Sequence, residues 1–192
     1  MREIRIHGRG GQGAVIASEI LADAAFRCGQ YVQAFPSFGS ERRGAPVAAF
    51  VRLDERQIWA RTEIYRPHGI IVLDEGLVTL KLADVTQGLQ AGGFVLLNSA
   101  RDPETFSYLG NFTVAVVDAG RIAIAHRLGS LTAPIVNTGI LGAFVSLTSW
   151  VTMESLEEAI KLHAPIKPEE NVQAAREAAA AVRILTAAGP RG

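Results

Sequence analysis

The hydrophobic and polar positions of the chain follow two patterns: short apolar runs of strand length, and longer stretches with helical spacing. The short runs predict strands and the longer stretches predict helices. The predicted strands are residues 4–7, 30–35, 47–53, 69–74, 93–98 and 113–118, with a possible short one at 57–61. The predicted helices are residues 14–28, 77–82, 121–128, 137–151, 155–163 and 168–185.

This alternation of strands and helices indicates an α/β fold with three layers. We expect a mainly parallel (mixed) sheet with helices on both faces, Rossmann-like in outline. Nearly continuous apolar runs such as residues 69–74 are typical of strands covered on both sides. Small residues in the apolar helix 137–151, among them Gly139 and Gly142, would allow another helix to approach closely. With no repeat or linker, we predict a single domain over residues 1–192.

Composition narrows the class of protein. Hydrophobic residues are 48% of the chain, the mean hydropathy is +0.20, and 19 basic residues balance 19 acidic ones. Zero net charge gives no attraction to nucleic acid or to an anionic membrane, and we expect neither as a partner. No apolar stretch approaches the roughly 18 residues of a membrane span. The surplus apolar surface indicates either a subunit interface or a generous core.

The cysteine and histidine content argues against a resident metal. Cys28 is the only cysteine, so the chain cannot form an internal disulfide, an iron–sulfur cluster or a cysteine zinc site by itself. The four histidines are scattered, and we predict no metal site in this chain. A single cysteine and the lack of a leader segment favour the cytoplasm.

The first candidate site is a glycine turn at residues 8–13, between the first predicted strand and the first helix. Glycine allows a tight turn and close approach of a ligand, and the helix that follows directs free N–H groups to the same place. This geometry suits a phosphate or another anion. The candidate residues of this glycine turn are Gly8, Gly10, Gly11, Gln12 and Gly13.

The spacing of Gly8, Gly10 and Gly13 also fits the dinucleotide fingerprint G-x-G-x-x-G. An ordinary nicotinamide or flavin site would place an acidic residue about 20 residues later, at the end of the second strand. Residues 31–36 contain no acid there, and a polar loop stands where the next helix should begin. We therefore expect no ordinary dinucleotide site.

The second candidate site is that polar loop, residues 37–44, which carries two adjacent arginines. Their forked donors suit a phosphate or carboxylate, and ligands of open α/β sheets bind beyond the carboxyl ends of strands. The alternative is a surface loop in which Glu41 pairs with the arginines. Arg52 and Arg61 could lie nearby if the next strands return past the same edge. The candidate residues are Ser37, Phe38, Glu41, Arg42, Arg43 and Gly44.

No catalytic triad, acid–base pair or P-loop is recognisable, so we predict no catalytic residue in this chain. Asp74, Glu75 and Asp118 follow predicted strands and could face the same cleft. We favour the interpretation that they cap the helices that come next.

The two motifs together resemble those of the gamma subunit of 2-oxoacid:ferredoxin (or flavodoxin) oxidoreductases. The resemblance rests on residues 8–13, on residues 36–47 with 49–52, and on the helix start at 137–142, and it spans the chain. Many relatives have Arg-Gly-Gly where this chain has Arg43-Gly44-Ala45. The form Arg-Gly-Ala-Pro-Val is more similar to the pyruvate and branched-chain branch than to the 2-oxoglutarate branch.

The resemblance implies an assembly that oxidatively decarboxylates a 2-oxoacid with coenzyme A, giving an acyl-CoA, CO2 and reduced ferredoxin. Thiamine diphosphate, magnesium and iron–sulfur clusters would be held by partner subunits of alpha, beta and delta type, and ferredoxin or flavodoxin would be the acceptor. This chain would hold no cofactor alone, with coenzyme A as a co-substrate.

Three roles remain open on the sequence. The chain could be such a subunit, with Arg42 or Arg43 holding a phosphate of coenzyme A. It could be a docking module whose glycine turn and loop touch only other subunits. It could also be a free-standing nucleotide-binding oxidoreductase.

Overall fold

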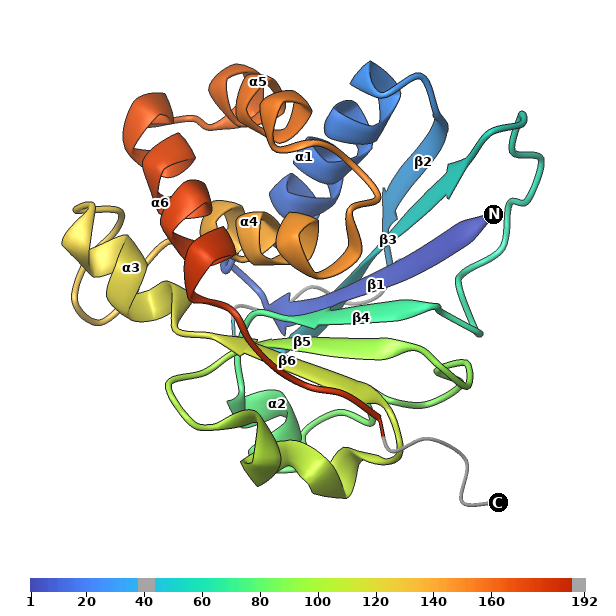
Figure 1. Cartoon of the computed structure of the whole chain (residues 1–192), viewed down its shortest axis with the longest axis horizontal. Coiled ribbons are helices and arrows are strands. Elements are labelled where there is room, and N and C mark those ends of the chain that lie inside the picture. The colour runs from blue at the N-terminus through green and yellow to red at the C-terminus, as the bar shows by residue number, and fades with distance from the viewer. Residues whose placement is uncertain (38–43, 188–192) are drawn as a thin grey trace.

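The structure, a computed structural model, describes residues 1–37 and 44–187 (Figure 1). In this part of the chain seven strands form one sheet in the order β2-β3-β1-β4-β5-β6-β7. The strands are β1 (Arg2–Arg9), β2 (Tyr31–Pro36), β3 (Pro46–Asp54), β4 (Gly69–Val72), β5 (Phe94–Asn98), β6 (Thr113–Val117) and β7 (Arg183–Leu185). The helices are α1 (Ala14–Arg27), α2 (Gly76–Thr79), the 3-10 helix η1 (Pro103–Leu109), α3 (Ala119–Ala125), α4 (Asn137–Thr148), α5 (Met153–His163) and α6 (Pro168–Ala181).

The centre of the sheet is parallel and its margins are antiparallel. Strands β1, β4, β5 and β6 run in one direction, whereas β3 pairs antiparallel with both β1 and β2, and β7 pairs antiparallel with β6. This mixed α/β sheet confirms the predicted fold class.

Helices cover both faces of the sheet (Figure 1). Helices α1, α4, α5 and α6 lie over one face, and α2 and η1 lie over the other. The side chains of β4 alternate accordingly: Ile71 packs in the larger apolar cluster, and Ile70 and Val72 pack in the smaller one. Burial on both faces explains why this strand reads as a continuous apolar run. Among the described helices, none is long and apolar enough to cross a membrane.

The hairpin of β2 and β3 explains why the expected acidic residue is missing. In an ordinary dinucleotide-binding fold the second strand lies beside the first. Here β3 lies between them, because Arg9 is paired with Pro46 and β3 is in turn paired with β2. The end of β2 is therefore one strand further from the glycine turn, and an acid there would not meet a ribose held at β1.

Three predicted elements need correction. Residues 57–61 form no strand; they belong to a connection that crosses from β3 to β4. The predicted helix 77–82 is only the short α2. The predicted helix 168–185 ends at Ala181, and Arg183–Leu185 form β7 instead. Extended backbone at Val182 and pairing with β6 override the alanine-rich helical pattern at that end.

Candidate functional site

A cleft of about 470 Å³ lies at the carboxyl ends of β1, β4 and β5. The chain leaves β1 for α1 on one face of the sheet and leaves β4 for α2 on the other face. Adjacent parallel strands whose connections diverge in this way form the crevice where ligands of open α/β sheets bind. The cleft is lined by Gly11, Gln12, Gly13, Ile16, Leu73, Asp74, Glu75, Asn98, Thr132, Ala133, Pro134, Ile135, Val136, Asn137, Thr138, Ala164, Pro165, Ile166 and Asn171.

The glycine turn lies between β1 and α1, as predicted, and its residues Gly11, Gln12 and Gly13 form one wall of this cleft. Gly11 and Gly13 have φ values of 96° and 80°, in the left-handed region that favours glycine. Gly13 is the N-cap of α1, and no side chain caps the first turn, which also contains no acidic residue. The free N–H groups and the positive end of the dipole of α1 therefore face the cleft.

The carboxylate of Asp74, which follows the neighbouring parallel strand β4, holds the glycine turn by hydrogen bonds. Its Oδ2 accepts hydrogen bonds from Arg9 Nε at 2.6 Å and from Gln12 Nε2 at 3.2 Å, and its Oδ1 accepts one from the N–H of Gly76 at 2.8 Å. Gln12 Oε1 in turn accepts a hydrogen bond from the N–H of Arg9 at 2.7 Å. Gly8 lies close to the same side chains: a Cβ added to Gly8 would be 3.2 Å from the Leu73 side chain and 3.4 Å from Gln12 Oε1.

The base of the loop 37–44 lies against the glycine turn. The N–H of Gly10 donates to the carbonyl of Ala45 at 2.9 Å, and the N–H of Gly44 donates to the carbonyl of Gly10 at 3.3 Å. The two predicted motifs thus share an edge. The predicted residues Phe38, Glu41, Arg42 and Arg43 lie outside the described residues.

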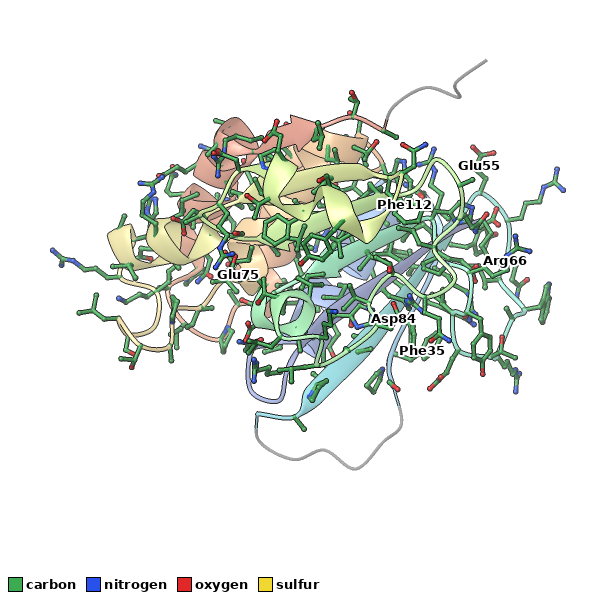
Figure 2. All side chains as sticks on the ribbon, turned by 90° about the horizontal axis from the view of Figure 1, so that it is seen from below. Phe35, Glu55, Arg66, Glu75, Asp84 and Phe112 are labelled. Atoms are coloured by element: carbon green, nitrogen blue, oxygen red, sulfur yellow. The ribbon has the colours of Figure 1, made fainter. Side chains whose placement is uncertain are left out.

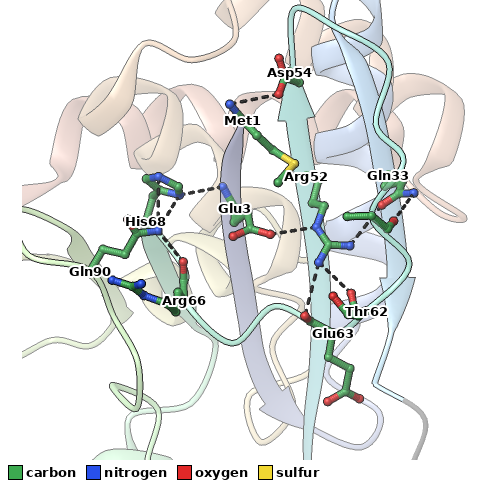
Figure 3. A network of polar contacts seen from close by, with 11 residues as sticks. Met1, Glu3, Gln33, Arg52, Asp54, Thr62, Glu63, Arg66, His68 and Gln90 are labelled. Atoms are coloured by element: carbon green, nitrogen blue, oxygen red, sulfur yellow. Dashed lines mark hydrogen bonds and ion pairs between the residues drawn. The ribbon is translucent and has the colours of Figure 1, made fainter.

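The other end of the loop is anchored by a network around Arg52 (Figure 3). Arg52 is 1% exposed, and its side chain donates to Glu3 Oε1 at 2.9 Å and to the carbonyl of Thr62 at 2.7 Å. The neighbouring Glu63 accepts a hydrogen bond from Ser37 Oγ at 3.2 Å. Arg52 is therefore a structural residue that holds Thr62 and Glu63 of the connection 55–68. It is paired with Glu3 at the start of β1, away from the glycine turn, so the expectation that it could lie near the candidate edge was wrong.

Amide side chains form the wall opposite the glycine turn. Asn137 Nδ2 donates to the carbonyl of Gly13 at 3.3 Å, which joins the first residue of α4 to the start of α1. Thr138 Oγ1 donates to Asn171 Oδ1 at 2.6 Å. Asn98, at the end of β5, donates to the carbonyl of Leu73 at 3.1 Å and accepts from the N–H of Gly120 at 3.2 Å.

These amides were not among the residues predicted for the site. Asn98 could have been found, because it ends a buried strand at the same edge as Asp74. Asn137 and Asn171 reach the cleft only because α4 packs against α1 and α6 packs against α4, and such a tertiary placement leaves no local signal in the sequence.

The strand-end acids have mixed roles. Asp118 caps α3 by accepting from the N–H of Arg121 at 2.8 Å, as favoured. Asp74 accepts from the N–H of Gly76 but also lines the cleft. Glu75, labelled in Figure 2 beside α2, makes no capping bond; it accepts from Ser99 Oγ and pairs with Arg101 at 3.6 Å.

This arrangement suits an elongated ligand with one anionic end. The anion would meet the N–H groups of the glycine turn, and an uncharged polar body would follow the amide wall and the apolar side chains of Pro134 and Ile166. The two carboxylates of the cleft, Asp74 and Glu75, are already paired with the cations Arg9 and Arg101, which lessens their repulsion of an anion.

Comparisons with known proteins identify the family of this chain. The family described as Pyruvate ferredoxin/flavodoxin oxidoreductase matches residues 3–181. The Pyruvate/ketoisovalerate oxidoreductases common subunit gamma of Thermococcus litoralis is 50% identical over an alignment of 182 residues, and the alignment covers 93% of this chain and 95% of that protein.

Two solved structures share the fold. The pyruvate oxidoreductase subunit PORC of Thermotoga maritima has a TM-score of 0.79 and 35% identity, and the alignment covers 95% of this chain and 97% of that one. The 2-oxoglutarate:ferredoxin oxidoreductase of Magnetococcus marinus, solved with coenzyme A bound, has a TM-score of 0.70 and 20% identity, and the alignment covers 98% of this chain but 32% of that one.

Proposed function

Because this chain belongs to the pyruvate ferredoxin/flavodoxin oxidoreductase family, in which it is a gamma-type subunit, we propose that it binds the phosphate-bearing end of coenzyme A at the glycine turn. The assembly around it would oxidatively decarboxylate a 2-oxoacid, transfer the acyl group to coenzyme A and reduce ferredoxin. Alpha, beta and delta-type subunits would hold the thiamine diphosphate, magnesium and iron–sulfur clusters, and the complex would work in the cytoplasm.

One observation carries the proposal: the glycine turn and the base of the arginine loop are hydrogen-bonded to each other, at the uncapped start of α1 and beside the cleft. A phosphate held there would accept hydrogen bonds from the N–H groups of Gly11 and Gly13 and would meet the positive end of the helix dipole, whereas the N–H of Gln12 already donates to the carbonyl of Arg9 at 2.9 Å. The loop between Ser37 and Gly44 would add Arg42 or Arg43, whose guanidinium groups bind phosphate through paired hydrogen bonds.

The names of the relatives also indicate which 2-oxoacid the assembly would use. The relative from Thermococcus litoralis is named for pyruvate and ketoisovalerate, and the Thermotoga maritima structure for pyruvate. This agrees with the Arg43-Gly44-Ala45-Pro46-Val47 form noted above. We propose pyruvate or a branched-chain 2-oxoacid as the substrate of the assembly.

The test replaces both Arg42 and Arg43 by alanine in the reconstituted complex. We expect the KM for coenzyme A to rise about tenfold or more with kcat unchanged, since a charge-assisted contact to the phosphate is lost. The matched control is the double variant Arg121→Ala and Arg176→Ala, which removes two exposed arginines that pair with Glu177 and Glu157 outside the cleft. An unchanged KM in the loop variant would remove the arginines from coenzyme binding.

A second role, docking without any ligand contact, is favoured by large apolar side chains on the surface. Leu131 is 80% exposed and Trp59 is 75% exposed, as expected of a chain whose neighbours in the complex cover part of its surface. A structure of the whole complex with coenzyme A bound discriminates the two roles. Coenzyme contacts made only by other chains would leave docking as the function of this subunit.

A further inference from the structure

We infer that Asp74 is a positioning residue: its carboxylate holds Arg9 and Gln12 so that the glycine turn is already in its binding conformation before an anion arrives. The inference rests on the proposed function for its ligand, but its evidence is separate. It concerns the contacts behind the glycine turn, and none of the residues of the loop 37–44 enters it.

Asp74 is placed where it can lock the turn. It follows β4, the parallel neighbour of β1, while Arg9 and Gln12 come from the end of β1 and from the turn itself. Both oxygens of the carboxylate are used, with Arg9 and Gln12 on Oδ2 and the N–H of Gly76 on Oδ1. The bond from Gln12 fixes the orientation of its amide, because Oε1 must then face the N–H of Arg9.

The hydrogen bonds between Asp74, Arg9 and Gln12 also reduce two effects that would oppose anion binding, namely the negative charge of Asp74 and the side-chain oxygen of Gln12. A lone carboxylate at the cleft would repel a phosphate, and the ion pair of 2.6 Å with Arg9 offsets that charge. The side-chain oxygen of Gln12 is turned toward the backbone of Arg9 and away from the free N–H groups at the start of α1. Those N–H groups are therefore left to the ligand.

The shape of Gly76 supports the same role. A Cβ at this position would lie 2.8 Å from Arg9 Nη2 and 2.8 Å from Asp74 Oδ1. The φ angle of Gly76 is not positive, so its backbone lies outside the left-handed region. Alanine would thus be tolerated by the backbone and would favour α2, yet it would press on the Arg9–Asp74 pair.

The main variant is Asp74→Asn in the reconstituted complex. Asparagine keeps the acceptor for the N–H of Gly76 but turns an NH2 group toward the donors of Arg9 and Gln12. We expect the KM for coenzyme A to rise about tenfold, the loss expected for hydrogen bonds to a charged group, with kcat unchanged. Asp118→Asn is the matched control, because Asp118 also follows a parallel strand and caps a helix, but lies outside the cleft.

A second variant and a second measurement keep the inference testable if Asp74→Asn does not assemble. Gly76→Ala should raise the KM for coenzyme A although it improves the helix. Hydrogen exchange of the ligand-free complex should be faster at the amides of Arg9 and Gln12 in both variants and unchanged in Asp118→Asn, because these two N–H groups donate to Gln12 Oε1 and to the carbonyl of Arg9 within the turn that Asp74 holds.

The outcomes separate this inference from the proposed function. If Gln12→Ala and the loop variant raise the KM but Asp74→Asn and Gly76→Ala do not, the positioning role is overturned while coenzyme binding stands. If none of these variants changes the KM, the proposed function fails, and the exchange experiment decides whether Asp74 holds the turn. Unchanged exchange in both Asp74→Asn and Gly76→Ala would overturn the inference in either case.

Discussion

Gly13 and Gly11 are both left-handed residues of the glycine turn, but only Gly13 is also confined by a neighbour. A Cβ on Gly13 would lie 2.5 Å from Asn137 Nδ2, whereas one on Gly11 would meet nothing within 4 Å. We expect Gly11→Ala to lower the free energy of unfolding by about 1–2 kcal/mol through backbone strain alone. Gly13→Ala should cost about 3 kcal/mol, because steric overlap is added. Urea unfolding of the purified variants measures both, and equal losses would contradict the role of Asn137.

His7 makes stability depend on pH, because its ring is held in the neutral form. Burial, and next the nearby Arg5 guanidinium, lower the pKa of His7 to about 3, and among the described residues its Nε2 has no hydrogen-bond partner. The unfolded chain binds a proton at a pKa of about 6.5. The contribution of His7 is therefore complete above pH 6.5 and is lost as the pH falls from there toward 3.

The corresponding variant is His7→Leu, which removes the titrating group from its partly buried position. Between pH 7 and pH 5 the wild-type chain should lose about 2 kcal/mol more stability than this variant, since each pKa unit corresponds to about 1.4 kcal/mol. Denaturant titrations at the two pH values check this. Equal losses of unfolding free energy in the two proteins would show that His7 is protonated in the folded state at pH 5.

At the scale of elements, the packing of α4 against α6 depends on one glycine. A Cβ on Gly142 would overlap the carbonyl of Ala175 in α6, whereas a Cβ on Gly139, one turn earlier, would be 3.8 Å from its nearest neighbour, the Cβ of Ala119. Gly142→Ala should therefore cost about 2 kcal/mol through overpacking. Gly139→Ala should be neutral or stabilising by up to about 1 kcal/mol, because alanine favours the helix. Thermal unfolding of the two variants tests the contrast, and a stable Gly142→Ala chain would refute the close approach.

The elements that could be predicted from the sequence are those with a strong local pattern. Buried strands such as β4 and β5 and the long helices α1 and α4 were found near their observed bounds, and Gly142 was found as a point of close helix contact. The strand β7 was missed, because its pairing with β6 overrides a helical pattern. Residues 57–61 were misread as a strand, because Gln33 holds Ala60, and Arg52 holds the neighbouring Thr62, by side-chain bonds that have no periodic signal.

For the molecule as a whole, the sequence predicted one edge of the site and missed its opposite wall. Gly11 to Gly13 and Gly44 could be found because glycine marks turns locally. Asn137, Thr138 and Asn171 join the cleft only through the packing of α4 and α6 over the sheet. The same packing places the cleft at the divergence of β1 and β4, which the order of strands along the chain does not reveal.

The composition of the chain determines what it can do alone. Cys28 is its only cysteine, and an iron–sulfur cluster needs several thiolate ligands. We therefore expect the purified chain to contain no iron and to give no 2-oxoacid-dependent reduction of ferredoxin or of a viologen dye. Adding it to a complex that lacks this subunit should restore coenzyme-dependent turnover, because under the proposed function the glycine turn and the cleft would then lie beside the subunits that hold the redox groups. Iron analysis and the dye assay, with Asp118→Asn as an unimpaired control, check both statements. Stoichiometric iron or dye reduction by the chain alone would contradict them.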